Sequence, residues 1–504
     1  MLACVRSAML FGVEGLIVDV QVHVSTGLPS YTFVGLPDAA VRESRDRVRA
    51  ALLSSGLSWP LRRVTVNLAP SGVRKSGPGL DLPFALGLMT ASDELPGGVL
   101  DGVGVIGELG LDGSLRPVPG VLGMVDALRR SGSTAVLVPA GNAAEAALVG
   151  DVRVLPATTL VEARDALKGE GDWAAVPRSP VEAPDAGEPG DDDHDAPDLC
   201  VVRGLAGGRR ALEVAAAGGH HLLMVGRPGA GKTLLARCLP SILPPLEPDE
   251  ALDVTRIHSA AGHSIRGRLV VNRPFRAPHH TASAAALVGG GSGRPRPGEV
   301  TLAHRGILFM DELAEFAPTV LDALRQPLED RVVRISRQGG ALTFPADFLL
   351  IAASNPCPCG LGPPDCVCSE SNRSRYRRRL SAPLVDRFDL RVALGPAAPG
   401  APPGPGSAVV QARVAEAMAR QRSRYRGWHW RRNARVPAGA LGRAIPLDGS
   451  AADALREVAE RRNWSGRGLA AVHRVARTLA DLEGRAAITP EHILLAAGLR
   501  EEVL

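Results

Sequence analysis

The stretch GRPGAGKT, residues 226–233, has the clearest chemistry in this chain. Its glycines permit backbone dihedrals that other residues avoid, so successive backbone N–H groups can turn toward an anion. The apolar run HLLMVG precedes it and LLARCL follows it, which predicts a strand, a turn and a helix whose amino end attracts phosphate. We therefore expect a nucleoside triphosphate to be bound by Gly226, Arg227, Pro228, Gly229, Ala230, Gly231, Lys232 and Thr233.

Polar side chains at the ends of two other apolar runs could complete a hydrolytic site. Asp311 and Glu312 end ILFMDE, and Asn355 ends FLLIAASN. Ligands of parallel sheets bind at the carboxyl ends of the strands, so these side chains are expected beside GRPGAGKT. Lys232 would reach the β- and γ-phosphates, while Thr233 and Asp311 would hold Mg²⁺. Glu312 would orient or deprotonate the attacking water and Asn355 would sense the γ-phosphate, which predicts hydrolysis with ATP and Mg²⁺ as cofactors.

The elements that must position these residues divide the chain into five parts. Residues 1–168 have the mixed strand and helix pattern of an α+β domain, and the acidic, Pro-rich residues 169–197 are expected to be a linker. Residues 198–395 alternate short apolar strands with helices, which is typical of a parallel α/β fold. The Pro/Gly-rich residues 396–406 form a second predicted linker. Residues 407–504 are expected to be helical throughout.

Charge is distributed unevenly along the 504 residues. The formal net charge is +5, yet residues 169–198 carry ten acids and one arginine, so the rest of the chain is strongly basic. A basic body is compatible with a polyanionic partner. The N-terminal stretch contains Arg6, Glu14 and Asp19, which argues against a signal peptide, and no apolar run is long enough to cross a bilayer. We expect a cytoplasmic protein with no membrane partner.

Several longer motifs identify a family. RPFRAPHHTASAAALVGGG, LRQPLEDR, SNPCPCG, LSAPLVDRFDL and VNLAPSGVRKSGPGLDLPFALG resemble the magnesium-chelatase-like AAA+ ATPases of the ComM (YifB) competence family. The resemblance covers nearly the whole chain except the acidic linker. It implies a multidomain α/β protein with an N-terminal α+β domain similar to that of Lon proteases. It also implies a central P-loop AAA+ core with a parallel sheet, and a C-terminal helical lid.

The same resemblance implies how the protein works and which partners it has. Members of this family are expected to form hexameric rings that translocate on DNA and drive branch migration in recombination or transformation. The implied partners are single-stranded or branched DNA, further copies of the same chain and recombination proteins. Arg387 matches the arginine that completes the neighbouring subunit's site. Arg467 matches the second sensor in the lid, with Arg474 as the alternative.

Several arginines are candidates for contact with the DNA backbone, which would give affinity without sequence specificity. Arg294, Arg296, Arg334 and Arg337 lie in stretches that this family uses as insertions facing the pore. Residues 420–435 mix arginine with the aromatic side chains Tyr425, Trp428 and Trp430, which could stack on unpaired bases. An amphipathic core helix followed by a solvated turn explains that last stretch equally well.

Two other classes of function remain open, an ATP-dependent protein remodeller or protease and a magnesium-chelatase subunit. Lon proteases have their serine nucleophile in a KDGPSAG-like turn, and this chain has KSGPGLD instead. Gly79 occupies the serine position, and Ser76 lies three residues too early. Acyl transfer then has no nucleophile, so we expect a domain without peptidase activity.

The sequence CPCGLGPPDCVC could bind a metal. Its two C-x-C pairs could wrap one structural Zn²⁺, or they could remain reduced thiols in a Pro/Gly loop; the four ligands would be Cys357, Cys359, Cys366 and Cys368. His279 and His280 are adjacent in sequence, which makes it awkward for both to ligate one metal. A structural or subunit-contact role is expected for the two histidines.

Overall fold

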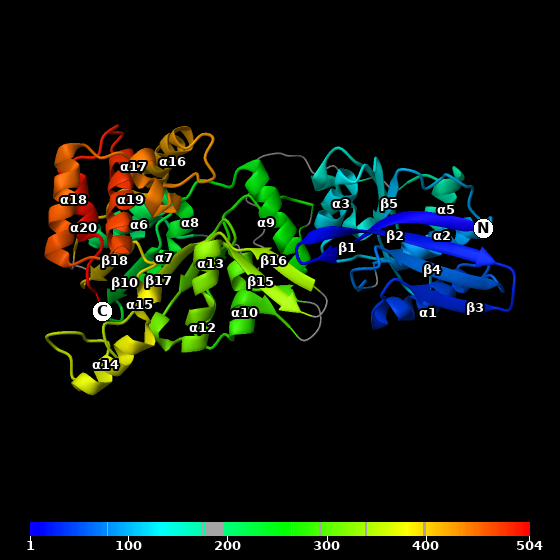
Figure 1. Ribbon diagram of the computed structural model, residues 1–504, viewed down its shortest axis with the longest axis horizontal. Helices are drawn as coiled ribbons and strands as arrows, with labels where there is room; N and C mark the ends of the chain where they lie inside the picture. Colours follow the sequence, from blue (N-terminus) through cyan, green and yellow to red (C-terminus); the bar gives the residue numbers. More distant parts are fainter. Residues whose placement is uncertain are drawn as a thin grey trace.

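The computed structural model describes residues 1–77, 79–173, 176, 196–263, 265, 267–291, 295–337, 340–396 and 400–503. Most of the predicted acidic linker, Arg294 and the side chain of Arg337 lie outside this part of the chain. Figure 1 shows two lobes, one built from the N-terminal residues in blue and cyan and one from the residues in green to red. Within the described residues, no helix combines the length and apolar character needed to span a membrane.

The N-terminal lobe is built on a seven-stranded mixed sheet with the order β3-β4-β2-β1-β5-β8-β9. Val18, Val20, Val22 and Val24 alternate with more exposed neighbours along β2 and are all buried, because one face of the sheet packs on a core. The strands are β1 (Leu2–Phe11), β2 (Glu14–Ser25), β3 (Ser30–Val34), β4 (Arg63–Ala69), β5 (Val103–Val105), β8 (Ala135–Pro139) and β9 (Arg153–Ala157), with a small ribbon of β6 (Glu108–Leu109) and β7 (Leu115–Arg116). Its helices are α1 (Ala39–Ser54), α2 (Asp81–Ala91), α3 (Val121–Arg130), α4 (Ala143–Ala146) and α5 (Leu160–Lys168).

The second lobe contains the predicted parallel sheet. Its five strands follow the order β11-β14-β17-β10-β18, and every neighbouring pair is parallel. The three central strands are buried along their whole length, which explains why they read as apolar runs rather than as alternating patterns. The strands are β10 (Leu222–Gly226), β11 (Phe275–Arg276), β14 (Ile307–Met310), β17 (Leu349–Ser354) and β18 (Leu390–Leu394).

Ten helices and two antiparallel ribbons of the described chain surround this sheet. The helices are α6 (Ala206–Gly218), α7 (Lys232–Arg237), α8 (Leu239–Ile242), α9 (Pro248–Ala261), α10 (Ala284–Val288), α11 (Glu299–Leu302), α12 (Pro318–Ala323), α13 (Arg325–Asp330), α14 (Glu370–Arg379) and α15 (Ala382–Val385). The ribbons pair β12 (Gly289–Gly290) with β13 (Arg296–Pro297), and β15 (Val332–Arg337) with β16 (Gly340–Pro345). Helix α9 packs against α3 of the N-terminal lobe, where Arg256 and Glu14 form an ion pair of 3.2 Å between the lobes.

The C-terminal region is helical, as the sequence predicts. It comprises α16 (Ser407–Arg424), α17 (Leu441–Ala444), α18 (Gly449–Arg462), α19 (Gly466–Leu482) and α20 (Pro490–Gly498). Both α16 and α19 pack against α6, so this region shares one apolar core with the parallel sheet. Thr489 caps α20 and Pro490 is its first residue, because proline has no N–H to leave unpaired there.

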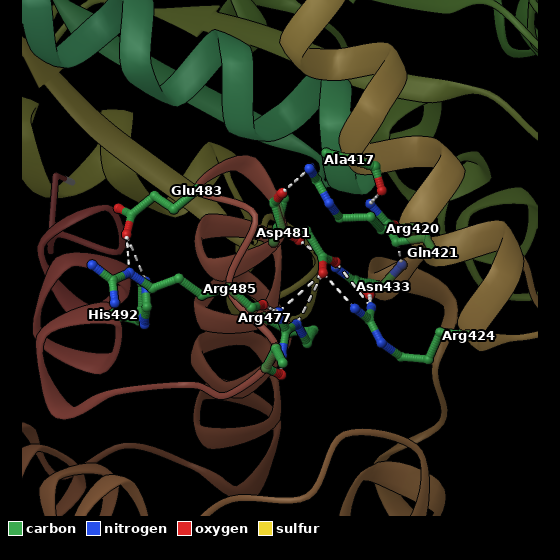
Figure 2. A network of polar contacts seen from close by, with 12 residues as sticks. Ala417, Arg420, Gln421, Arg424, Asn433, Arg477, Asp481, Glu483, Arg485 and His492 are labelled. Carbon is green, nitrogen blue, oxygen red and sulfur yellow. Dashed lines mark hydrogen bonds and ion pairs between the residues drawn. The ribbon is translucent and has the colours of Figure 1, made fainter.

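Within residues 420–435, Tyr425 packs in this core, so the prediction that Tyr425 stacks on unpaired bases is wrong and the alternative of an amphipathic core helix holds for it. Tyr425 is buried, and its hydroxyl donates a hydrogen bond of 2.7 Å to the Asn433 side chain. Close by, the fully buried Asp481 carboxylate accepts hydrogen bonds from Arg424, Arg477 and Asn433 (Figure 2). A buried carboxylate is stable only when it is paired in this way. The arginine-rich stretch therefore joins helices α16 and α19.

Candidate nucleotide site

The phosphate loop lies between β10 and α7. Gly229 and Gly231 have φ values of +77° and +82°, which a residue with a Cβ adopts only at a cost, so glycine is required at these two turns. The strand ends at Gly226 and the helix begins at Lys232. The loop thus has the strand–turn–helix context that a phosphate-binding motif needs.

Lys232 joins this loop to the neighbouring strand β17. Its buried ammonium donates hydrogen bonds to the carbonyl oxygens of Gly226 and Arg227 at 2.6 and 2.9 Å. It also donates to Oδ1 of Asn355 at 3.1 Å. Burial lowers the pKa of Lys232, while the nearby Asp311 and Glu312 carboxylates act in the opposite direction. Asn355 therefore lies at the phosphate loop, where the sequence places it.

Thr233 and Asp311 provide the oxygen atoms that a magnesium ion prefers. The Thr233 hydroxyl donates a hydrogen bond of 2.8 Å to Oδ2 of Asp311, which follows the end of β14. Hydroxyl and carboxylate oxygens are hard donors that suit Mg²⁺, and their closeness lets both reach one ion. These two residues fit the metal that the sequence predicts.

Glu312 follows in a left-handed backbone conformation, with φ at +51°. Non-glycine residues adopt this conformation rarely, and the Glu312 carboxylate is half-exposed. The carboxylate lies 3.4 Å from Nδ1 of His280. The His280 ring also contacts the His279 ring in a tilted arrangement, with ring centroids 4.1 Å apart. The sequence reasoning missed this placement of His280 beside Glu312, although the motif APHHTAS marked the position.

Arg387 and Arg467 lie together at the opposite edge of the sheet. Each places a guanidinium nitrogen 2.7 Å from Oε1 of Glu329, and these two cations hold the pKa of Glu329 below its usual range. Arg387 precedes β18 at its amino end, whereas the phosphate loop follows the carboxyl end of the parallel neighbour β10. A five-residue strand separates these edges by more than about 13 Å. Neither arginine contacts the phosphate loop of its own chain.

Arg474, the alternative candidate for the second sensor, makes contacts that stabilise the fold. It is largely buried, and its Nε donates a hydrogen bond of 2.8 Å to the Val436 carbonyl. Burial lowers the pKa of Arg474, and the Asp389 carboxylate opposes this effect. The hydrogen bond of Arg474 to Val436 therefore lies within the helical region.

Comparison with known proteins assigns the family. Three models described as magnesium chelatase subunit ChlI, or parts of it, match residues 20–142, 198–400 and 404–500. The competence protein ComM of Haemophilus influenzae is 38% identical over 509 residues, covering 100% of this chain and 98% of that protein. The chain belongs to the magnesium-chelatase-like ComM family.

Further ComM-family relatives match over the same span. An uncharacterized protein of Mycobacterium tuberculosis is 43% identical over 500 residues, covering 98% of each chain. YifB of Escherichia coli is 38% identical over 511 residues, covering 99% of this chain and 97% of YifB. Membership in this family implies the use of ATP and Mg²⁺, in agreement with the donor set at Lys232, Thr233 and Asp311.

Proposed function

We propose that this protein is an ATP-driven motor that works as a ring of identical chains on single-stranded or branched DNA. In this proposal the ring promotes branch migration during homologous recombination or natural transformation. The Haemophilus relative is named a competence protein, which supports a role connected with DNA uptake. The observation that carries the proposal is the separation of Arg387 from the hydrolytic residues of its own chain.

The hydrolytic half of the mechanism uses the residues at the carboxyl edge of the sheet. Lys232 would bind the β- and γ-phosphates, and Thr233 and Asp311 would hold the Mg²⁺ that neutralises phosphate charge. Glu312 has an exposed carboxylate that can accept a proton from water or orient it. Asn355 already shares a hydrogen bond with Lys232, so it can report the state of the γ-phosphate to β17.

The position of the two arginines supports the proposed ring. An arginine at the amino edge of the sheet can complete a phosphate site only in another copy of the chain, and a repeated head-to-tail contact of this kind forms a ring when its rotation closes. Arginine suits that role because it stays charged and can bind two phosphate oxygens at once. Arg467 shares the Glu329 carboxylate with Arg387, so we infer that both cations face the same neighbouring nucleotide.

Exposed arginines provide the surface for a nucleic-acid backbone. Arg334 lies on the β15–β16 ribbon with 60% of its side chain exposed, and Arg296 lies on the β12–β13 ribbon. Helix α14 adds a basic surface that the sequence reasoning missed, with its exposed cations at Arg375, Arg377, Arg378 and Arg379. Non-specific contacts of this type predict salt-sensitive binding.

The N-terminal lobe is interpreted as a Lon-like domain without peptidase activity. Gly79 stands where a Lon-type serine would be, and an added Cβ at this position would meet only Val118 at 3.8 Å. The space around Gly79 could therefore accommodate a larger side chain. We infer the lack of peptidase activity from the missing hydroxyl nucleophile and not from a steric limit. We infer that this lobe supports assembly or substrate engagement.

A strand-exchange assay on a branched DNA substrate tests the proposal. Wild-type protein with ATP and Mg²⁺ should move the branch, whereas Lys232→Ala and Glu312→Gln should not. We expect Lys232→Ala to lose ATP binding and Glu312→Gln to bind ATP in an assembled ring while hydrolysis falls by about 10² or more. Branch movement that persists in both variants would reject the motor.

Two rival functions give different results. Stimulation of the ATPase by unfolded protein rather than by DNA would favour a protein remodeller. Copurification with a porphyrin-binding partner would favour a chelatase subunit. A strictly monomeric protein in the presence of ATP and DNA would reject the ring.

A further inference from the structure

Four cysteine sulfur atoms meet in the loop between β17 and α14. Cys357 Sγ lies 3.2 Å from Cys359 Sγ and 3.5 Å from Cys366 Sγ, and Cys359 Sγ lies 3.9 Å from Cys366 Sγ. Cys368 completes the group, in which all four sulfur atoms lie within 4.8 Å of one another. Cys357 is buried and the other three are partly exposed.

These separations match a tetrahedral metal site. Zinc–sulfur distances of about 2.3 Å put neighbouring sulfur atoms of a tetrahedron about 3.8 Å apart. The three distances given above lie around that value, and they are much longer than the S–S bond of a disulfide, about 2.0 Å. Two C-x-C arms therefore place their sulfur atoms around one point without forming a covalent pair.

A backbone N–H group supports negative charge on one of these sulfur atoms. The N–H of Gly362 donates a hydrogen bond to Cys357 Sγ at 3.4 Å. Such bonds stabilise a thiolate, which is the form of cysteine that binds a metal. Residues 356–369 contain no helix or strand, so the loop needs another source of order.

The same loop lies directly on the phosphate loop. The Asp365 carboxylate forms an ion pair of 2.5 Å with Arg227, and a Cβ added to Gly360 would lie 2.8 Å from Pro228. Asn355, which accepts a hydrogen bond from Lys232, precedes the first cysteine by two residues. Anything that orders the cysteine loop therefore also orders one wall of the nucleotide site.

We propose that Cys357, Cys359, Cys366 and Cys368 bind one structural Zn²⁺ that holds this loop against the phosphate loop and thereby supports nucleotide binding. Four thiolates close the coordination shell, so the metal is structural and has no position open for a reacting water. The metal site itself is independent of the motor function, and only its effect on ATP affinity depends on the proposed nucleotide site.

Metal analysis of the full-length protein tests the site directly. Protein purified under reducing conditions without chelators should contain about one zinc per chain, and the Cys366→Ser/Cys368→Ser double variant should contain almost none. The matched control is Cys4→Ser, because Cys4 is exposed on β1 in the other lobe. Cobalt bound in place of zinc should give the thiolate charge-transfer absorption of a four-sulfur site. A wild-type protein without zinc that also gives no such band with cobalt would overturn the proposal.

ATP affinity, measured without DNA, tests the contact with the phosphate loop. The double variant should bind ATP about fivefold or more weakly than wild type, whereas Cys4→Ser should match wild type. Because the double variant could lose structure, wild-type protein stripped of zinc and then resupplied provides the second measurement. Affinity should fall on stripping and return with zinc. Zinc loss that leaves ATP affinity unchanged in both experiments would contradict the proposal that the metal supports nucleotide binding. A failed branch-migration assay has no bearing on either readout.

Discussion

The Lys232 ammonium and the Asn355 side-chain oxygen lie 3.1 Å apart and connect the phosphate loop to the end of β17. Two residues separated by 123 positions in sequence thereby share one hydrogen bond at the carboxyl edge of the parallel sheet. The Lys232 ammonium donates its hydrogen bonds to two backbone carbonyls and to Asn355. A bound phosphate group would compete for this ammonium and would therefore weaken its hydrogen bond to Asn355. This relationship supports the proposal that Asn355 senses the nucleotide.

Replacement of Asn355 by alanine should reduce ATP hydrolysis more than ATP binding. In the proposed mechanism the amide places the γ-phosphate or the attacking water, so we expect kcat to fall by about 10- to 100-fold and ATP affinity by less than about fivefold. Steady-state ATPase kinetics and a fluorescent-nucleotide titration measure the two effects. Equal losses in binding and hydrolysis would contradict the sensor role.

Mixed assemblies should reveal that Arg387 acts on a neighbouring chain. Arg387→Ala and Lys232→Ala should each be inactive alone, because one lacks the arginine and the other lacks the phosphate-binding lysine. In a random equal mixture, roughly a quarter of the interfaces join an intact phosphate loop to an intact Arg387, so ATPase activity should recover to about that fraction. A mixture that stays as inactive as its two components would show that Arg387 does not act between subunits.

Loss of the Asp481 carboxylate should strongly destabilise the helical region. Asp481→Ala would leave the Arg424 and Arg477 cations in the interior without their buried partner, which costs about 3–5 kcal/mol. Urea unfolding of the full chain, followed by circular dichroism, measures the change. The control is Glu416→Ala, because Glu416 pairs with Arg420 at the surface and should change stability by less than about 1 kcal/mol.

Two buried histidines should make the protein less stable in mild acid. Burial lowers the pKa of His221 to about 3 and that of His304 to about 4. In each ring Nδ1 accepts a backbone N–H, from Leu350 and Asp347 respectively, so the native protein keeps both rings neutral. In the unfolded chain, both histidines bind a proton below a pH of about 6.5. Each histidine should therefore lower the free energy of unfolding by up to about 1.4 kcal/mol for each pH unit below that value.

The measurement is the urea midpoint at pH 7 and at pH 5. A His304→Gln variant offers a side-chain oxygen to the Asp347 N–H and cannot take up a proton, so its midpoint should depend less on pH than that of wild type. Equal pH dependence in the two proteins would exclude His304 as a source of the effect.

The sequence by itself determined the phosphate loop, the strand-end residues Asp311, Glu312 and Asn355, and the parallel sheet that carries them. These features are local, because a glycine-rich turn and an apolar strand with a polar end are each formed by residues that are adjacent in the sequence. The family also followed from contiguous motifs.

The tertiary structure alone decided which distant side chains meet. It put Arg387 and Arg467 on one carboxylate at the edge away from the phosphate loop, and it put His280 beside Glu312. It also buried Tyr425 where composition suggested an exposed stacking surface. Charge and aromatic content do not show whether a side chain points to solvent or into the core. An arginine can do either, and only the packing of the helices places Arg424 and Arg477 against the buried Asp481.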